Sequence, residues 1–352
     1  MKDIIIADRK VGLNQPTLII AEVGVNHNGD IKRGYELIDK AADAGVDVVK
    51  FQTYKAKNIV TKKAERYWDE SLNDEKSYGT QYDTFSKLDS LGLDEYKKLK
   101  KRCIERNVIF TSTPFNLPDI DILDEVGVDL FKVSSSDITY IEFIEEIAKR
   151  NKPIIISTGC ASIKEIEAAV NAVKKKNNNK IILQHCILQY PCDDENVNLE
   201  KMLKIKEFFS DIPVGYSDHS IGITIPQSAV SLGALTIEKH FTVDNNLPDS
   251  PDHKLSANPE QLKSLVENIR RIEKAKGVFI NGHYPAELAA LKLARKSLVS
   301  SCFIKKGTKI EKKMITAKRP GTGIKPTEIG SLLGKIAKVD ISEDTTLNKD
   351  MF

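Results

Sequence analysis

Charged and hydroxyl side chains recur at the ends of short Ile- and Val-rich runs along this chain. Lys50 and Lys132 lie near the ends of two such runs, and Thr111, Ser135 and Ser157 add hydroxyl groups at corresponding positions. Lysine ammonium groups bind phosphate or carboxylate as point charges, and hydroxyl groups donate further hydrogen bonds to such anions. These five residues predict an anion-binding site; the alternative is that the two lysines extend into solvent.

Two histidines and two glutamates occupy similar positions. His219 and His240 follow consecutive runs, so their imidazoles could converge and, with water and substrate oxygens, would suit Mn²⁺, Co²⁺, Zn²⁺ or Fe²⁺. A pair of structural histidines is the alternative. Burial at such a position would raise the pKa of Glu22 or Glu238 and suit either carboxyl to proton transfer, unless it only forms a salt bridge with a lysine.

Composition limits the class of protein. The 352 residues are 41% hydrophobic and 29% charged, which is typical of a globular chain with a sizeable core. A net charge of +3 argues against nucleic acid as the main partner, and the apolar stretches are too short to span a membrane. The first ten residues lack the apolar stretch of a secretory signal, and the five cysteines form no CxxC pair. We therefore expect a cytoplasmic protein with reduced thiols.

Eight short apolar runs must position these polar groups. The runs do not alternate polar with apolar residues, as in parallel strands buried on both faces. They span residues 17–23, 46–53, 108–113, 130–134, 153–158, 180–186, 212–216 and 234–240, and helical spacing predicts helices at 32–44, 162–174, 224–232 and 258–274. The alternation predicts an α/β fold, a (β/α)8 TIM barrel whose catalytic groups lie at the carboxyl ends of the strands. A doubly wound sheet is disfavoured because no GxGxxG follows the first run.

The chain also predicts a second, smaller domain. We expect the barrel over residues 1–280, a linker helix over 281–295 and a small β-rich domain over 296–352, with strands in the runs LVSSCFI and IAKVDI. A domain of this size is marginally stable by itself. The long polar segment 56–93 interrupts the alternation and contains Trp68 and Tyr78, so we expect it to be functional or lid-like.

Nine short motifs resemble those of the N-acetylneuraminate (sialic acid) synthase family. In the family's order, they are AEVGVNHNGD (21–30), VKFQTYKAKN (49–58), FTSTPF (110–115), FKVSSSD (131–137), IISTG (155–159), GYSDHS (215–220), EKHFT (238–242), PDHKLS (251–256) and KRPGTG (318–323). The resemblance implies a TIM barrel followed by an antifreeze-like SAF domain, in a domain-swapped homodimer. It also implies an enzyme that joins phosphoenolpyruvate to a 2-acetamido hexose and water, giving a nine-carbon 2-keto acid and phosphate.

Position by position, the resemblance implies roles for the site residues. Phosphoenolpyruvate would be held by Lys50, Thr111, Lys132, Ser135 and Ser157. A divalent ion would be bound by His219 and His240, with Mn²⁺ expected and Mg²⁺ or Co²⁺ as alternatives. Catalytic roles would fall to Glu22, which would handle protons at the reacting sugar carbon, and to Lys50, Asp137 and Glu238. The sugar would contact Gln52, Tyr190 and Asp252, and the partner subunit's copy of Arg319 would hold its N-acyl group.

The sequence departs from the family pattern near the substrate. Residues 134–137 read SSSD where the family often has GSGE, which leaves the reach of Asp137 and any hydrolytic role open. Leu188 stands where asparagine or threonine is common. N-acetylmannosamine, giving N-acetylneuraminate, is the default acceptor; a 2,4-diacetamido-trideoxy hexose, giving legionaminic acid, is the main alternative, and a pseudaminic acid precursor is a further one.

Two other functions remain open. Lys132 could form a Schiff base with pyruvate in an aldolase, which requires a lysine desolvated enough to be neutral. The C-terminal module could instead belong to a non-catalytic sugar- or ice-binding protein. Six lysines between residues 305 and 318 argue against a flat ice-binding face.

Overall fold

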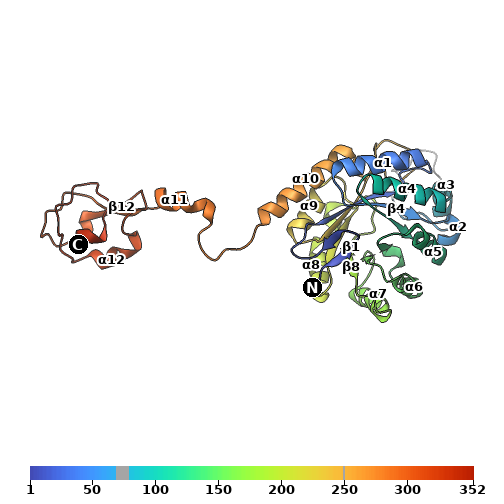
Figure 1. Ribbon diagram of the computed structural model, residues 1–352, viewed down its shortest axis with the longest axis horizontal. Helices are drawn as coiled ribbons and strands as arrows, with labels where there is room; N and C mark the ends of the chain where they lie inside the picture. Colours follow the sequence, from blue (N-terminus) through green and yellow to red (C-terminus); the bar gives the residue numbers. More distant parts are fainter. Residues whose placement is uncertain (69–78, 249) are drawn as a thin grey trace. The chain divides into compact units, whose positions relative to one another are not determined.

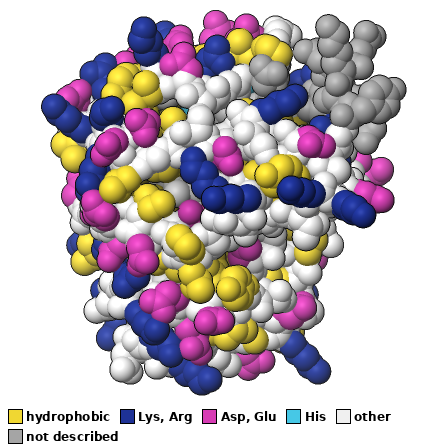
Figure 2. Space-filling model, turned by 90° about the vertical axis from the view of Figure 1, so that its right-hand side faces the viewer, with side chains coloured by type: hydrophobic (Ala, Val, Ile, Leu, Met, Phe, Trp, Pro, Cys, Tyr) yellow, Lys and Arg dark blue, Asp and Glu magenta, His cyan; other side chains and the backbone are white. Residues whose placement is uncertain are grey.

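The computed structural model describes residues 1–68, 79–248 and 250–352 (Figure 1). These residues form two compact units, Met1–Gly277 and Val278–Phe352, each with its own hydrophobic core. Among the helices of the described ranges, none combines the length and the apolar character of a membrane span. Figure 2 shows side chains of both charges interspersed over one face, in keeping with a net charge of only +3.

In the described residues, eight parallel strands form the centre of the first unit. They are β3 (Leu18–Gly24), β4 (Val48–Thr53), β5 (Ile109–Pro114), β6 (Phe131–Val133), β7 (Ile154–Ser157), β8 (Ile181–His185), β9 (Val214–Asp218) and β10 (Thr236–His240). The sheet order is β5-β4-β3-β10-β9-β8-β7-β6. The end strands β5 and β6 also pack together, and the Thr111 hydroxyl donates a 2.9 Å hydrogen bond to Leu130 O across this junction. The predicted strands and the (β/α)8 barrel are confirmed.

Helices follow the strands and pack on the outside of the barrel (Figure 1). They are α1 (Ile31–Ala44), α4 (Leu93–Glu105), α5 (Leu117–Val126), α6 (Ile141–Lys149), α7 (Ile163–Lys175), α8 (Leu199–Phe208), α9 (Thr224–Ser231) and α10 (Pro259–Lys276). Local sequence sets their ends: Ser162 and Glu165 form the capping box of α7, and Asn258 caps α10. The four helices predicted from spacing are confirmed to within two residues at each end.

Two apolar layers position the strands. The larger layer lies between the sheet and the helices, where Phe51 of β4 and Leu37 of α1 are fully buried. The second layer fills the barrel at the amino ends of the strands. There Ile6 and Val11, from the antiparallel hairpin of β1 (Ile4–Ile6) and β2 (Arg9–Val11), pack against strand residues such as Ile20. The hairpin, which the sequence did not predict, closes this end with apolar side chains, so polar groups gather at the opposite end.

The segment after β4 carries two short helices, α2 (Ala56–Ile59) and α3 (Gln81–Leu88). Residues of this segment form a separate apolar cluster with residues that follow β3, β4 and β5: Val25, Tyr54, Ile59, Phe85, Leu88 and Phe115. The segment therefore packs over the carboxyl ends of these strands, where we expected a functional or lid-like segment. Tyr78 and the rest of 69–78 lie outside the described residues.

The second unit is a small module of short elements. Strands β11 (Ser297–Ser300) and β12 (Ile315–Lys318) pair antiparallel. The helical turns are η4 (Pro285–Glu287), α11 (Leu288–Leu293), η5 (Lys312–Met314), η6 (Pro326–Glu328), α12 (Ile329–Leu332) and η7 (Lys349–Met351). β11 confirms a strand in LVSSCFI, but the prediction for IAKVDI was wrong: among these described residues, Ile336 and Ile341 form only single bridges. Ala337 and Ile341 of that run are buried, but Val339, which a strand would place on the same face between them, is 46% exposed, and this breaks the two-residue repeat of a strand.

Candidate active site

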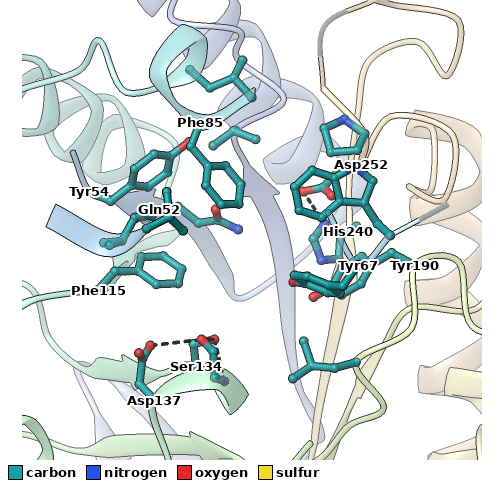
Figure 3. A pocket seen from close by; sticks show the side chains of 18 residues that line it. Gln52, Tyr54, Tyr67, Phe85, Phe115, Ser134, Asp137, Tyr190, His240 and Asp252 are labelled. Carbon is teal, nitrogen blue, oxygen red and sulfur yellow. Dashed lines mark hydrogen bonds and ion pairs between the residues drawn. The ribbon is translucent and has the colours of Figure 1, made fainter. Parts of the chain in front are cut away.

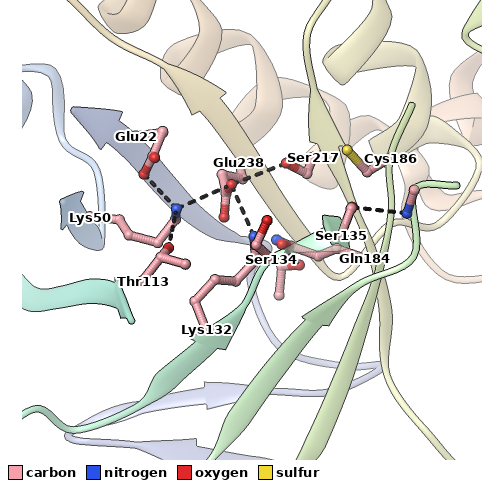
Figure 4. A network of polar contacts seen from close by, with 12 residues as sticks. Glu22, Lys50, Thr113, Lys132, Ser134, Ser135, Gln184, Cys186, Ser217 and Glu238 are labelled. Carbon is pink, nitrogen blue, oxygen red and sulfur yellow. Dashed lines mark hydrogen bonds and ion pairs between the residues drawn. The ribbon is translucent and has the colours of Figure 1, made fainter. Parts of the chain in front are cut away.

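Two lysines and two glutamates meet inside the carboxyl end of the barrel (Figure 4). Lys50 Nζ lies 2.6 Å from Glu22 Oε2 and 3.5 Å from Glu238 Oε1, and Lys132 Nζ lies 3.3 Å from the same Glu238 oxygen. They extend from β3, β4, β6 and β10, and none is more than 4% exposed. The structure thus brings four of the predicted residues into one buried cluster of opposite charges.

Burial and opposite charge act against each other in this cluster. Burial alone would lower the pKa of Lys50, but Glu22 and Glu238 outweigh it and raise this pKa. Burial lowers the pKa of Lys132 in spite of Glu238. Burial also raises the pKa of Glu22, whereas at Glu238 the two lysines overcome burial and lower the pKa to about 2. Glu22 is therefore suited to hold and release a proton, and Glu238 to remain an anion.

The cluster borders a small cavity of about 50 Å³ that also carries hydroxyl groups. Lys50 Nζ donates a 3.1 Å hydrogen bond to Thr113 Oγ1, and Ser217 Oγ donates a 3.1 Å bond to Glu238 Oε1. Within the described ranges, Ser157 Oγ and Glu238 Oε2 are buried and have no hydrogen-bond partner. Because buried polar atoms are normally paired, these two atoms indicate space for a polar ligand.

The hydroxyl residues predicted for the anion site divide into two groups. Ser135 and Ser157 line the small cavity, and Ser135 Oγ accepts a 2.9 Å hydrogen bond from Gly159 N. Thr111 does not line it, because its hydroxyl is used by Leu130 O. Thr113 lies on the same face of β5, one layer nearer the carboxyl end, and reaches Lys50 instead. Every second residue of a strand faces the same side, so Thr113 could have been predicted together with Thr111 from the sequence.

The predicted metal ligands lie beside one another at the edge of this cavity. The ring centroids of His219 and His240 are 5.3 Å apart. His219 Nδ1 lies 2.7 Å from Ile187 O and so carries the proton, which makes Nε2 the ring nitrogen that can bind a metal; Cys186 Sγ lies 4.0 Å from this Nε2. His240 Nδ1 lies 3.4 Å from Asp252 Oδ2. Metal-binding histidines commonly engage a carbonyl or a carboxylate in this way through their other ring nitrogen, so the two side chains fit a divalent ion.

Two imidazoles would be the protein ligands of such an ion. Across the described residues, no group of three or more His, Cys, Asp or Glu side chains is arranged to hold a metal. Water and substrate oxygens would therefore complete the coordination, which leaves open positions as in a catalytic site. Cys186, which was not predicted for the site, also lines the cavity, with Sγ 3.7 Å from His219 Nδ1.

The residues predicted to contact the sugar surround the same opening. Gln52 Nε2 donates a 3.0 Å hydrogen bond to Glu22 Oε1, and the Tyr190 ring stacks on His219 with centroids 4.1 Å apart. Asp252 pairs with His240, which lowers the pKa of Asp252 in spite of burial. Glu22, Gln52 and Asp252 all approach Gly24, whose φ of 55° favours glycine and where a Cβ would lie within 3.3 Å of each of them. The chain bends there because the β3–β4 register shifts between Glu22 and Gly24.

A second cavity of about 330 Å³ adjoins the first and shares six lining residues with it: Gln52, Phe115, Ser134, Leu188, Tyr190 and His240. Figure 3 shows Tyr54, Phe85 and Phe115 along one side, with Tyr190, His240 and Asp252 facing them and Ser134 and Asp137 below. The rings of Tyr54 and Phe115, with centroids 5.9 Å apart, pack edge to face. None of these three aromatic residues was predicted for the site from the sequence.

Asp137 borders this larger cavity at the end of the 3₁₀ turn η2 (Ser135–Asp137). Ser136 Oγ donates a long, 3.4 Å hydrogen bond to Asp137 Oδ2. Burial raises the pKa of Asp137 to about 7. The folded state therefore binds a proton that the unfolded state has released above about pH 4, and stability falls as pH rises from there through pH 7.

Replacing Asp137 with asparagine is expected to remove this loss of stability at high pH, because the amide carries no titrating carboxyl. We expect the variant to be more stable than the wild type by about 1 kcal/mol at pH 8, after allowing for solvent screening of the half-buried carboxyl, and the difference to vanish near pH 4. Urea unfolding at both pH values measures it. A difference that does not change with pH would contradict the assignment.

Arg319 lies in the second unit, just after β12. The structure describes each unit by itself, so the role implied for Arg319 at the active site of a partner subunit stays a prediction.

Comparison with known proteins identifies the family. The model of the NeuB family matches residues 37–281, and the model of the SAF domain matches residues 295–352. The N,N'-diacetyllegionaminic acid synthase of Campylobacter jejuni is 43% identical over 95% of this chain and 99% of its own length. The enzyme of the same name from Legionella pneumophila is 38% identical over 96% of this chain and 94% of its own.

A solved structure agrees with both the fold and the family. The N-acetylneuraminic acid (sialic acid) synthetase of Leptospira borgpetersenii serovar Hardjo-bovis, in complex with citrate, superposes with a TM-score of 0.73 at 36% identity. The match covers 82% of this chain and 95% of that structure. The predicted non-catalytic alternative is therefore not retained. The chain belongs to the NeuB family of phosphoenolpyruvate-dependent, carbon–carbon bond-forming nonulosonic acid synthases, and it ends in a SAF domain.

Proposed function

We propose that this enzyme condenses phosphoenolpyruvate with the open-chain aldehyde of a 2,4-diacetamido-trideoxy hexose and water, giving a legionaminic acid and phosphate. The observation that carries the proposal is the pair of adjoining cavities. The small one holds two lysines with buried, unpaired polar atoms, and the large one opens from it at Tyr190 and His240. This arrangement suits a compact anion that reacts with a larger, mostly neutral partner.

Phosphoenolpyruvate is assigned to the small cavity. The ammonium groups of Lys50 and Lys132 would neutralise its phosphate and carboxylate charges and hold it in one orientation. Ser157 Oγ, which has no partner among the described residues, would donate to one of its oxygens. Burial raises the pKa of Glu22, so this carboxyl offsets the charge of the two lysines less than the ionised Glu238 does, which favours an anionic ligand.

A divalent ion, for which Mn²⁺ is our expectation, would be held by His219 and His240 and would act as a Lewis acid on the acceptor aldehyde. The carbonyl of Ile187 and the carboxylate of Asp252 orient the two imidazoles for this task.

The chain's own groups then manage charge and protons. The methylene carbon of phosphoenolpyruvate attacks the aldehyde carbon, and Glu22 gives its proton to the aldehyde oxygen as the carbon–carbon bond forms. The enol carbon becomes cationic, and the ionised Glu238 nearby stabilises this charge. Water adds to that carbon and returns a proton to Glu22. The adduct then loses phosphate by C–O cleavage, and its hydroxyl proton leaves with the phosphate.

The lining of the large cavity supports an uncharged acceptor. Among the described residues, it includes no lysine or arginine, whereas the carboxylate of Asp252, whose pKa is lowered, would repel a phosphate group. This favours a free sugar over a sugar 6-phosphate. We propose the diacetamido acceptor over N-acetylmannosamine because relatives at 43% and 38% identity are named N,N'-diacetyllegionaminic acid synthases.

The Schiff-base alternative requires a neutral Lys132. Burial lowers the pKa of Lys132, which favours this chemistry, but the ionised Glu238 lies 3.3 Å from the amine and stabilises its charged form. Borohydride reduction in the presence of pyruvate tests the alternative, because covalent trapping of pyruvate on Lys132 would support an aldolase.

We further propose a homodimer in which the partner's Arg319 completes the acceptor site. Mixing an inactive Lys50→Met protein with an inactive Arg319→Ala protein tests it, because a mixed dimer would regain one complete site. Mixtures that stay inactive after subunit exchange would contradict the arrangement.

The proposed reaction predicts a specific pattern of phosphate release. With Mn²⁺ and phosphoenolpyruvate, we expect kcat/KM to be roughly tenfold or more higher with the 2,4-diacetamido-trideoxy hexose than with N-acetylmannosamine, and lower still with its 6-phosphate. Phosphate release, with the product identified by mass spectrometry, measures this. Preference for N-acetylmannosamine would overturn the acceptor assignment, and no release with any acylamino sugar would overturn the reaction.

A further inference from the structure

Two hydrogen-bond donors line the large cavity and have no partner among the described residues. Tyr54 is 4% exposed and Trp68 is 7% exposed, and both line the cavity. Among the described residues, neither Tyr54 Oη nor Trp68 Nε1 has a hydrogen-bond partner. Buried polar groups without a partner are rare and costly, so a ligand that supplies acceptor atoms would satisfy both.

The surroundings of the two donors are apolar. The ring of Phe85 lies between them, with its centroid 5.6 Å from Tyr54 and 5.7 Å from Trp68. Leu88 and Phe115 complete this recess (Tyr54, Trp68, Phe85, Leu88 and Phe115), and both line the cavity. Figure 3 shows Tyr54, Phe85 and Phe115 across the cavity from His240. The recess thus combines hydrogen-bond donors with a hydrophobic surface.

The chemistry of these groups restricts what the recess binds. An indole N–H only donates, so its partner must be an oxygen or another acceptor and not an amine or an ammonium group. The apolar rings around it favour a small alkyl group close to that oxygen. An N-acyl group has both features, because its carbonyl oxygen accepts hydrogen bonds and its methyl group is apolar.

The position of the recess indicates which part of the acceptor it receives. The aldehyde carbon must meet phosphoenolpyruvate where the two cavities join, among the residues that line both: Gln52, Phe115, Ser134, Leu188, Tyr190 and His240. Of the recess residues, Phe115 lies at this junction, whereas Tyr54, Trp68, Phe85 and Leu88 line only the large cavity. The recess therefore extends from the junction into the large cavity, where it can contact a substituent of the acceptor that is remote from the aldehyde.

We propose that the recess binds the acetamido group on C4 of the acceptor, with Tyr54 Oη and Trp68 Nε1 donating to acetamido oxygen and the methyl group packed against Phe85 and Leu88. This inference rests on the proposed reaction and names the residues that select its diacetamido substrate. Asp137 and the serines beside it line another wall and are not required for this contact.

Tyr54→Phe is the sharpest test because it removes one donor and retains the ring that packs on Phe115. Two acceptors are compared: the 2,4-diacetamido-trideoxy hexose, and the matched sugar with a hydroxyl at C4. We expect Tyr54→Phe to lower kcat/KM for the diacetamido sugar roughly tenfold, mainly through KM, and to change kcat/KM for the hydroxyl sugar less than twofold. The KM for phosphoenolpyruvate should not change.

Trp68→Phe provides a second variant with the same expected selectivity, should Tyr54→Phe fail to fold. Tyr140→Phe is the matched control, because Tyr140 is 42% exposed and stacks on Phe143 outside the cavity. An equal loss of kcat/KM with both sugars, or no loss with either, would contradict the proposed role of the recess but not the proposed reaction. A wild-type protein that uses neither sugar would overturn the proposed function, and the recess with it.

Discussion

The Lys50→Met variant is expected to lose at least about three orders of magnitude in kcat/KM, because it removes a cation at the phosphoenolpyruvate site and the group that holds Glu22 in place. The same change leaves Glu22 and Glu238 buried, with Lys132 pairing only with Glu238 among the described ion pairs of the cluster. Breaking a buried ion pair in this way typically costs about 3–5 kcal/mol of unfolding free energy. Steady-state phosphate release and urea unfolding measure the two effects.

The loss of stability should depend on pH in a defined direction. Burial already raises the pKa of Glu22, and the loss of Lys50 raises it further, so the folded variant keeps this proton to a higher pH than the folded wild type does. The variant therefore loses stability relative to the wild type as pH rises through and above the raised pKa of Glu22 in the folded wild type.

Lys97→Met is the matched control for Lys50→Met. Lys97 pairs with Glu125 at the surface, where both side chains are largely solvated, so its loss should cost less than about 1 kcal/mol and leave activity unchanged. Near wild-type kcat/KM in Lys50→Met would contradict the assigned phosphoenolpyruvate site.

Removing the metal is expected to abolish turnover, and His219→Ala to prevent its recovery. We expect chelated wild-type protein to regain activity with Mn²⁺, whereas His219→Ala should remain at least about three orders of magnitude less active at any practical Mn²⁺ concentration. The imidazole provides one of only two protein ligands proposed for the ion, so Mn²⁺ binding measured by calorimetry should weaken in parallel. This binding readout does not depend on catalysis.

An exposed histidine serves as the comparison. His283 lies in the second unit and is exposed, so His283→Ala should bind Mn²⁺ and turn over substrate as the wild type does. Full activity of His219→Ala in chelated buffer would defeat the metal assignment.

Much of the fold followed from local pattern. Strands buried on both faces need continuous apolar runs, so the eight runs predicted the barrel, and Ser162 with Glu165 predicted the start of α7. The hairpin of β1 and β2 escaped prediction because strands of three residues are too short to show a repeat. IAKVDI looked like a strand because apolar composition alone does not reveal which of its residues are buried.

The site was only partly predictable for a related reason. In a barrel the carboxyl ends of all strands meet at one end, so the polar residues that end them predicted the convergence of Lys50, Lys132, Glu22 and Glu238. How deep each side chain lies within the barrel was harder to infer. Thr111 lies one layer below Thr113, and its hydroxyl bonds to Leu130 O only because β5 packs against β6, whereas Thr113 reaches Lys50.

By itself, then, the sequence determined the class of the fold, the end of the barrel that bears chemistry and the charged groups gathered there. Each of these depends on residues close together in the chain. Tertiary structure alone decided which carboxyl can hold a proton, since burial and the distances to both lysines set the pKa values of Glu22 and Glu238. It also decided the aromatic recess, because Tyr54, Phe85 and Phe115 follow different elements and meet only where the segment after β4 packs over the strand ends.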